Sequence, residues 1–283
     1  MSSRIPALVL LALPALFTPL HAGFQDHIGL QLWSLRAEFG KDANHALDQV
    51  KQFGLTEVET AGTANLTAEQ FRADLDARGL KAISAHVQYG DMDKDIAAVV
   101  RTVQVLGAKF AICPWIPHEG AFDAATMKRA AQNFDRWGAA FRAAGITFGY
   151  HPHGYEFVPG EKAGDTLFDE LVAATNPQDV SYQLDVFWAY IAGADPVKLL
   201  EKYPSRWVSL HVKDIRPGVA RAAGTSHAEE TDNVAVGSGQ IDWKALLSTA
   251  EKIGVKYYFI EDETAAPMTN IPISAAYLRQ LKL

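Results

Sequence analysis

The sequence predicts an α/β protein folded as a single (β/α)8 TIM barrel. Short runs rich in β-branched and aromatic residues alternate eight times with longer helical patterns, and no linker-like break interrupts residues 23–283. Six of the eight predicted strands end in His, Asp or Glu, and a barrel builds its active site at those ends. A doubly wound open sheet is the alternative, but we find no glycine-rich phosphate loop of the kind such sheets use.

Each strand is predicted from a short apolar run that leads away from a glycine or a polar turn. The first run, 27–33, includes Ile28, Leu30 and Leu32, and the fifth, 146–151, ends in a histidine. The eight predicted strands are 27–33, 56–59, 80–87, 109–113, 146–151, 180–185, 207–212 and 257–261.

The helices are predicted from apolar residues spaced three and four apart, and from their start and stop signals. Thr67 and Gln70 form a capping box, and Gly54, Gly79 and Gly107 are placed to end helices. The eight predicted helices are 43–53, 67–79, 93–106, 124–144, 164–175, 196–202, 241–253 and 274–281. The segment 215–240 is long and irregular, and we expect either a lid above the catalytic face or a disordered insertion.

Composition narrows the class of protein. A chain of 283 residues with 48% hydrophobic residues is long enough to bury a large core. A net charge of -7 and the lack of a long basic run argue against a nucleic-acid partner. Cys113 is the single cysteine, which excludes an intramolecular disulfide and a cysteine-rich zinc site. We expect it to be a small buried residue.

The first 22 residues are typical of a cleavable signal peptide. Arg4 precedes the apolar run 7–17, and Ala22 ends a short cleavage-like stretch. Proline interrupts the apolar run, which is also too short to span a membrane. We therefore expect domains at 1–22 (signal peptide) and 23–283 (barrel), export to the periplasm or the medium, and no stable membrane anchor.

The stretch 149–157 carries the clearest chemical signal. His151 and His153 are one residue apart at a strand end, and Glu156 follows three residues later. Imidazoles and a carboxylate that converge in this way can bind a metal or transfer protons. The alternative interpretation of this stretch is a polar loop whose histidines hydrogen-bond nearby backbone. The predicted barrel favours the first interpretation, because burying several ionisable groups together is costly without a metal or substrate.

Four predicted strand ends supply a ligand set of two nitrogens and two carboxylates. This mixture suits Mn²⁺, Zn²⁺, Co²⁺ or Fe²⁺, so we expect a divalent cation without specifying which. The predicted metal ligands are His151, Asp185, His211 and Glu261. As catalytic groups we expect His153, Glu156, Glu261 and Lys213.

The expected substrate contacts are Glu59, His86, Trp33 and Trp188. Each has a structural alternative: Glu59 and His86 as hydrogen-bonded residues outside any site, Lys213 as part of a solvated pair with Asp214, and the aromatic residues as caps on the core. Aromatic faces around one opening also suit a carbohydrate, which is the small-molecule partner that we expect. The sequence does not indicate an oligomeric state.

Taken in order, several short motifs resemble the xylose-isomerase-like barrel superfamily, which includes sugar phosphate isomerases and epimerases and is related to type-two apurinic endonucleases. The resemblance covers nearly all of 23–283. Its carriers are the segments 29–36, 149–157, 184–185, 193–196, 210–214, 236–243 and 260–261.

In the family's ketose epimerases, a divalent metal is held by Glu, Asp, His and Glu from strands five to eight. The resemblance implies ligands at the same four positions in this chain. Asp185, His211 and Glu261 match the last three positions, but His151 stands at the first. Trp188 stands where the epimerases often have histidine. Because those epimerases pass protons between two metal-bound glutamates, His151 sets this chain apart, and Glu156 is the candidate to replace the missing carboxylate as ligand or base.

The His-x-His version of the motif resembles a branch thought to act on oxidised sugars and glycosides. We therefore expect a metal-dependent isomerase or epimerase that removes a proton beside the carbonyl of an unphosphorylated sugar or 3-keto glycoside. The alternatives are a lyase or hydrolase of the same fold, and a barrel that binds carbohydrate without catalysis. A nuclease is disfavoured by the acidic composition.

Overall fold

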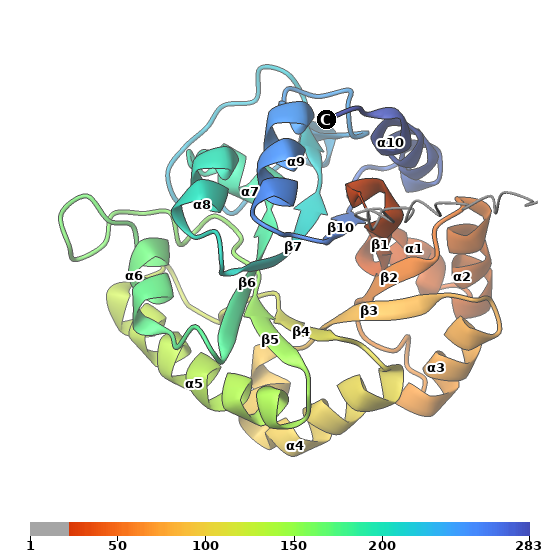
Figure 1. Cartoon of the computed structure of the whole chain (residues 1–283), viewed down its shortest axis with the longest axis horizontal. Helices are drawn as coiled ribbons and strands as arrows, with labels where there is room; N and C mark the ends of the chain where they lie inside the picture. The colour runs from red at the N-terminus through yellow and green to blue at the C-terminus, as the bar shows by residue number, and fades with distance from the viewer. Residues whose placement is uncertain (1–22) are drawn as a thin grey trace, which may run out of the picture.

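Eight parallel strands close into a barrel in the order β1-β10-β7-β6-β5-β4-β3-β2, which confirms the predicted fold class (Figure 1). The computed structural model describes residues 23–283. The predicted signal peptide, 1–22, lies outside the described residues. The barrel strands are β1 (Ile28–Gln31), β2 (Glu57–Thr60), β3 (Lys81–His86), β4 (Phe110–Cys113), β5 (Thr147–Tyr150), β6 (Val180–Asp185), β7 (Trp207–Val212) and β10 (Tyr257–Ile260). All eight correspond to predicted strands.

The predicted helices surround the barrel (Figure 1). They are α2 (Ala43–Gln52), α3 (Ala68–Asp76), α4 (Tyr89–Leu106), α5 (Ala124–Ala143), α6 (Leu167–Ala174), α8 (Pro196–Lys202), α9 (Trp243–Lys252) and α10 (Pro267–Gln280). The capping box of Thr67 and Gln70 at the start of α3 is confirmed. Gly107 ends α4 with a φ of 73°, a left-handed conformation that favours glycine.

Two short helices were not predicted, and two predicted helices, α4 and α10, start earlier than expected. α1 (Arg36–Phe39) follows a 3-10 turn, Leu32–Leu35, after β1, and α7 (Val186–Ile191) follows β6 directly. The residues of α7 are mostly β-branched or aromatic, so its sequence resembles a strand. α10 begins at Pro267 rather than at 274, and Pro272 lies inside it, which hid the helical pattern.

The core lies between the strands and the surrounding helices. Phe134, Trp137 and Phe141 on α5 pack against Phe148 on β5, with ring centroids 5.5 to 6.5 Å apart. Cys113 is fully buried at the end of β4, as predicted, and burial raises the pKa of its thiol to about 12. None of the helices in the described part of the chain is long and apolar enough to cross a membrane.

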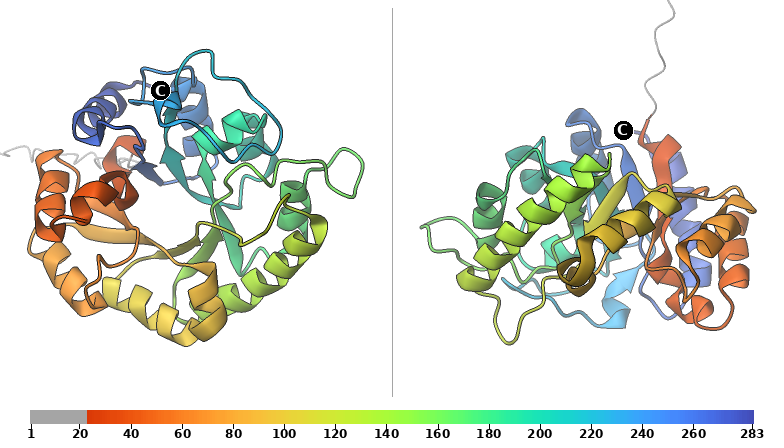
Figure 2. Two further views of the ribbon diagram at one scale, coloured as in Figure 1. Left: turned by 180° about the vertical axis from the view of Figure 1, so that it is seen from behind. Right: turned by 90° about the horizontal axis from the view of Figure 1, so that it is seen from below.

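The segment 215–240 is neither disordered nor a cover for the cavity described below. β8 (Asp214–Ile215) pairs with β9 (Asn233–Val234) in an antiparallel ribbon. The buried Asp214 carboxylate accepts hydrogen bonds from the backbone of Gly237 and Gly239, at 2.9 and 3.1 Å. The segment arches over α7 at one side of the barrel (Figure 2), where the Ala222 amide donates to Ile191.

Candidate metal centre and active site

The ends of β6 and β7 and the residue after β10 bring three predicted ligands together. His211 Nδ1 lies 3.3 Å from Glu261 Oε2 and 3.6 Å from Asp185 Oδ2. His151, which follows β5, places its Nε2 3.8 Å from the same Asp185 oxygen. Atoms that share one tetrahedral zinc at bond lengths of about 2.1 Å lie about 3.4 Å apart. The separations therefore suit a shared cation.

Asp185 is held in one orientation because it ends β6 and caps α7. Its Oδ1 accepts a hydrogen bond from the backbone N–H of Trp188 at 2.8 Å. Its Oδ2 is buried and has no hydrogen-bond partner. A buried carboxylate oxygen without a partner is costly, and a bound cation would remove that cost. Asp185, His211 and Glu261 bring one ligand atom each within 4.8 Å of one another and so fit such an ion, and His151 lies beside them, 3.8 Å from Asp185.

The two ligand imidazoles are oriented from below by other buried side chains. His151 Nδ1 lies 2.8 Å from the amide oxygen of Gln183, so Nδ1 donates and Nε2 keeps its lone pair. His211 Nε2 contacts Oε1 of Glu59, which leaves Nδ1 to face Asp185 and Glu261. Carboxylates and amides that hold metal-ligating histidines in this manner fix both tautomer and ring orientation.

Glu59 is fully buried beneath the site and does not line the cavity above it. Its carboxylate accepts hydrogen bonds from Gln31 at 2.6 Å, from Ser84 at 2.5 Å and from Gln183 at 2.7 Å. Glu59, predicted as a substrate contact, thus faces other protein side chains and not the cavity. With every side filled by protein groups, it is a positioning residue for His211.

We expect Glu59→Gln to weaken metal affinity by about 10- to 100-fold, the usual cost of losing such a partner. The amide removes the charge that faces His211 while keeping nearly the same shape. Competition with a chelator measures the change. Glu57→Gln is the matched control, because Glu57 lies on the same strand but faces His27 at 3.2 Å. An affinity equal to that of the wild type would contradict the assigned role.

The electrostatics of the cluster also favour a cation. Burial lowers the pKa of His211, but Glu59 and Glu261 raise it more, so that it lies well above its usual value. Burial raises the pKa of Glu261, but Lys213 and His211 lower it well below its usual value. The carboxylates thus create a site that attracts positive charge, and a divalent ion can replace the proton on His211.

Glu156 lies apart from this ligand group. Its Oε1 accepts hydrogen bonds from the Tyr150 hydroxyl and the His153 amide, and its Oε2 accepts one from the Gly154 amide at 2.9 Å. Of the two candidates for the strand-five position, it is therefore His151 that faces Asp185. The Glu156 carboxylate instead ties down the loop that carries His153.

Burial raises the pKa of Glu156 to about 7, from an ordinary value of 4.5. Because the folded protein favours the neutral carboxyl, its contribution to stability is fully present below pH 4.5 and is lost as the pH rises through 7. A shift of this size corresponds to about 3 kcal/mol. In Glu156→Gln nothing titrates at this position.

We therefore expect the unfolding free energy of Glu156→Gln, relative to wild type, to rise by about 3 kcal/mol between pH 4.5 and pH 7.5. Urea unfolding at several pH values measures this difference. Glu161→Gln, in an exposed loop, is the control. A difference that stays constant over this range would contradict the expectation.

Lys213 is buried beside the ligand group rather than solvated. Its Nζ contacts Glu263 and lies 3.4 Å from Oε2 of Glu261. It also lies 4.9 Å from the ring centroid of Phe187 and 5.0 Å from that of Trp188. Burial lowers the pKa of Lys213, but the neighbouring carboxylates raise it by more than burial lowers it. The ammonium therefore stays charged. Lys213, predicted as a catalytic group, does not line the cavity itself but contacts two carboxylates that do, Glu261 and Glu263.

A cavity of about 260 Å³ opens above the ligand group. His153 lines it, with its ring centroid 5.4 Å from Trp115 and 5.7 Å from Trp188, and its buried Nδ1 has no hydrogen-bond partner. Burial lowers the pKa of His153 to about 4. The side chains that surround the space include Trp33, Trp115, Trp188, His86, His151, Glu261 and Glu263. The predicted contacts Trp33, His86 and Trp188 are thus in place for a ligand.

Several polar residues of the site were not predicted. Gln31, Ser84, Gln183, Ser209 and Glu263 complete the hydrogen-bond network or the cavity wall. A signal was present for two of them: Gln183 and Ser209 lie two residues before Asp185 and His211, and so share their face of the strand. Residue type alone did not mark them, because an uncharged polar side chain in a strand is common outside any site.

The fold and the ligand group together define a (β/α)8 barrel with a candidate metal site at the carboxyl ends of its strands. The model of the xylose isomerase-like TIM barrel family matches residues 47–281. The chain belongs to this family, as the resemblance in its motifs predicted.

Individual relatives are more distant. Inosose dehydratase of Lacticaseibacillus casei is 23% identical over 268 residues, covering 84% of this chain and 88% of the relative. The rhizopine catabolism protein MocC of Rhizobium meliloti is 24% identical over 267 residues, covering 84% and 80%. A solved sugar phosphate isomerase/epimerase from Parabacteroides distasonis superposes with a TM-score of 0.73 at 25% identity, covering 94% of this chain and 98% of that one.

Proposed function

We propose that this protein is a metal-dependent lyase that eliminates water or an alcohol from a ketone-bearing polyol or sugar. The observation that carries the proposal is the cavity itself. Two of the candidate metal ligands, His151 and Glu261, line it together with His153, a histidine that no protein group satisfies at Nδ1. The name of the Lacticaseibacillus casei relative, inosose dehydratase, belongs to the same reaction class.

The candidate ligands His151, Asp185, His211 and Glu261 would hold the divalent cation. When bound, such an ion supplies Lewis-acid chemistry: it polarises a substrate carbonyl and acidifies the hydrogen on the neighbouring carbon. The metal's identity is left open by the ligand set.

The chain's own residues then move the proton. His153 removes the hydrogen from the carbon beside the carbonyl, and the electron pair of that bond becomes the new C=C bond. The bond from the next carbon to its oxygen substituent breaks, and the imidazolium of His153 returns the proton to the leaving oxygen. Atoms and electrons balance without a second acid or an oxidant.

The residues around the cavity favour an unphosphorylated substrate. Trp33, Trp115 and Trp188 offer aromatic surface for a sugar or polyol ring. Among the described residues that line the cavity there is no lysine or arginine to pair with a phosphate. As the sequence predicts, we also propose that residues 1–22 direct export, which removes the protein from cytoplasmic sugar phosphates. N-terminal sequencing of the exported form tests this.

Isomerisation or epimerisation is the second candidate function, favoured by the likeness to the sugar phosphate isomerase/epimerase of Parabacteroides distasonis. Both classes begin with the same proton removal. A two-base epimerase needs a base on each face of the substrate, and in this chain the residue after β5 that approaches Asp185 is His151 rather than a glutamate. The lyase needs a base on one face only.

Turnover in D2O distinguishes the two classes. Metal-loaded protein is incubated with a keto-inositol and with methyl 3-keto-glucoside, and the products are followed by NMR and ultraviolet absorbance. The lyase releases water or methanol and forms an unsaturated ketone. An isomerase or epimerase incorporates deuterium without releasing either. No reaction with either compound, and no deuterium exchange, would overturn the proposal.

A further inference from the structure

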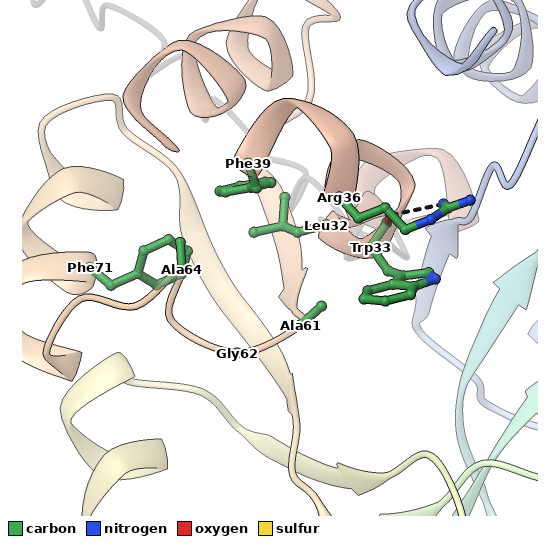
Figure 3. A pocket seen from close by; sticks show the side chains of 8 residues that line it. All are labelled: Leu32, Trp33, Arg36, Phe39, Ala61, Gly62, Ala64 and Phe71. Atoms are coloured by element: carbon green, nitrogen blue, oxygen red, sulfur yellow. Dashed lines mark hydrogen bonds between the residues drawn. The ribbon is translucent and has the colours of Figure 1, made fainter. Parts of the chain in front are cut away.

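A second, mainly apolar cavity of about 140 Å³ lies beside the catalytic cavity. Leu32 and Phe39, from the segment after β1, face Ala64 and Phe71, which come from the loop after β2 and from α3 (Figure 3). These segments follow the carboxyl ends of their strands, so the second cavity opens on the same face of the barrel as the candidate metal centre.

The two cavities share walls. Trp33 and Ala61 line both of them. The indole N–H of Trp33 donates to Glu263 Oε1 at 3.1 Å, and Glu263 lines the catalytic cavity. Trp33 as a residue is 46% exposed, although its ring is held by this bond and by Arg36, whose guanidinium lies 5.3 Å from the ring centroid. A group bound in the second cavity would thus lie next to a substrate in the first.

The size and the walls of the second cavity suit one aromatic ring. An apolar cavity of about 150 Å³ in another protein binds benzene. Phe39 is half-buried in the wall of the second cavity, and its ring packs against the buried Phe71 with centroids 6.4 Å apart. The loop that shapes the wall also adopts unfavourable backbone conformations: Ala64 and Asn65 have φ of 52° and 62°, a left-handed region that residues other than glycine rarely adopt. Backbone strain of this kind is found at ligand sites.

We propose that the second cavity binds an aryl leaving group, so that the substrate is a keto sugar that carries an aryloxy substituent. The inference rests on the proposed lyase function and names its substrate class. The step is the elimination already described: the C–H bond beside the carbonyl and the C–O bond to the aryl oxygen break, the C=C bond forms, and the aryl oxygen leaves with the proton as a phenol.

Two pairs of probes test this. Phenyl and methyl 3-keto-glucoside differ only in the leaving group, and phenyl and methyl glucoside give the same comparison for binding without turnover. We expect kcat/KM and affinity to favour the phenyl compounds by at least tenfold, since one small apolar group in a fitted pocket contributes about 10- to 200-fold. Phe39→Asp places a carboxylate in the wall of the second cavity only. It should abolish the preference and leave the methyl compounds unaffected.

Ile273→Asp is the matched control, because Ile273 is an exposed apolar residue on α10, 47% accessible and outside both cavities. Circular dichroism verifies that both variants fold; if Phe39→Asp does not, Phe39→Ser replaces it. Equal affinity for phenyl and methyl glucoside, or a phenyl preference that survives in the Phe39 variant, would overturn the inference. Failure of the proposed function has a different signature: the phenyl preference in binding persists, but no keto compound is turned over.

Discussion

Asp185→Asn is expected to abolish metal binding and turnover while the fold is retained. Asparagine caps a helix as well as aspartate does, so the bond from Oδ1 to the Trp188 amide can persist and α7 remains in place. The group in the position of Oδ2 becomes an uncharged NH2, which cannot act as a metal ligand. Since the loss of a partner outside the ligand set costs about 10- to 100-fold in affinity, the loss of a ligand should cost more than 100-fold.

Elemental analysis and chelator competition measure the metal, and product formation measures turnover. His211→Ala and Glu261→Gln should show the same losses, since their side chains share the site with Asp185. Asp195→Asn is the matched control: Asp195 caps α8 through the amides of Val197 and Lys198 and does not line the catalytic cavity. A metal content equal to that of the wild type in the Asp185, His211 and Glu261 variants would contradict the assignment of the metal centre.

His153→Gln is expected to lower kcat by about 10²- to 10⁴-fold, the usual contribution of a positioned acid–base group, and to leave the metal content unchanged. Its ring lies next to His151, with centroids 4.6 Å apart, but it is absent from the two groups of candidate ligands found in the described chain. The variant thus separates proton transfer from metal binding. Exchange of the substrate's acidic hydrogen with D2O should fall in parallel with kcat.

His118→Gln is the matched control for this prediction. His118 stacks on Trp115, the same ring that His153 contacts edge-on, but it does not line the cavity. It should therefore have near-normal kcat. If His153→Gln keeps kcat within about threefold of the wild type, His153 is not the proton carrier and the proposed mechanism is wrong.

The barrel could be predicted because its signals are local. Each strand is a short, mainly apolar run, and most of the main helices have their own amphipathic pattern and their own cap or stop residue. The ligand candidates could also be predicted, since a charged residue at the end of a buried strand is unusual wherever the strand lies. α7 escaped prediction because it is one and a half turns of strand-like residues, and its cap, Asp185, is also the last residue of β6.

The environment of each site residue depended on contacts between distant parts of the chain. Glu59 and His211 are 152 residues apart, and only barrel closure brings the carboxylate of the one to the ring of the other. No local pattern could show that Glu59 lies beneath the site, or that Glu156 turns toward Tyr150 and the loop backbone.

The sequence by itself thus determined the barrel, the family and the residues able to bind a metal, because periodicity and residue type are properties of short segments. Only the tertiary structure decided which of those residues face one another, which support them from below and which surround the cavity. The reason is geometric: a side chain's hydrogen-bond partners and burial follow from how all eight strands are packed, and that packing is not encoded in any one of them.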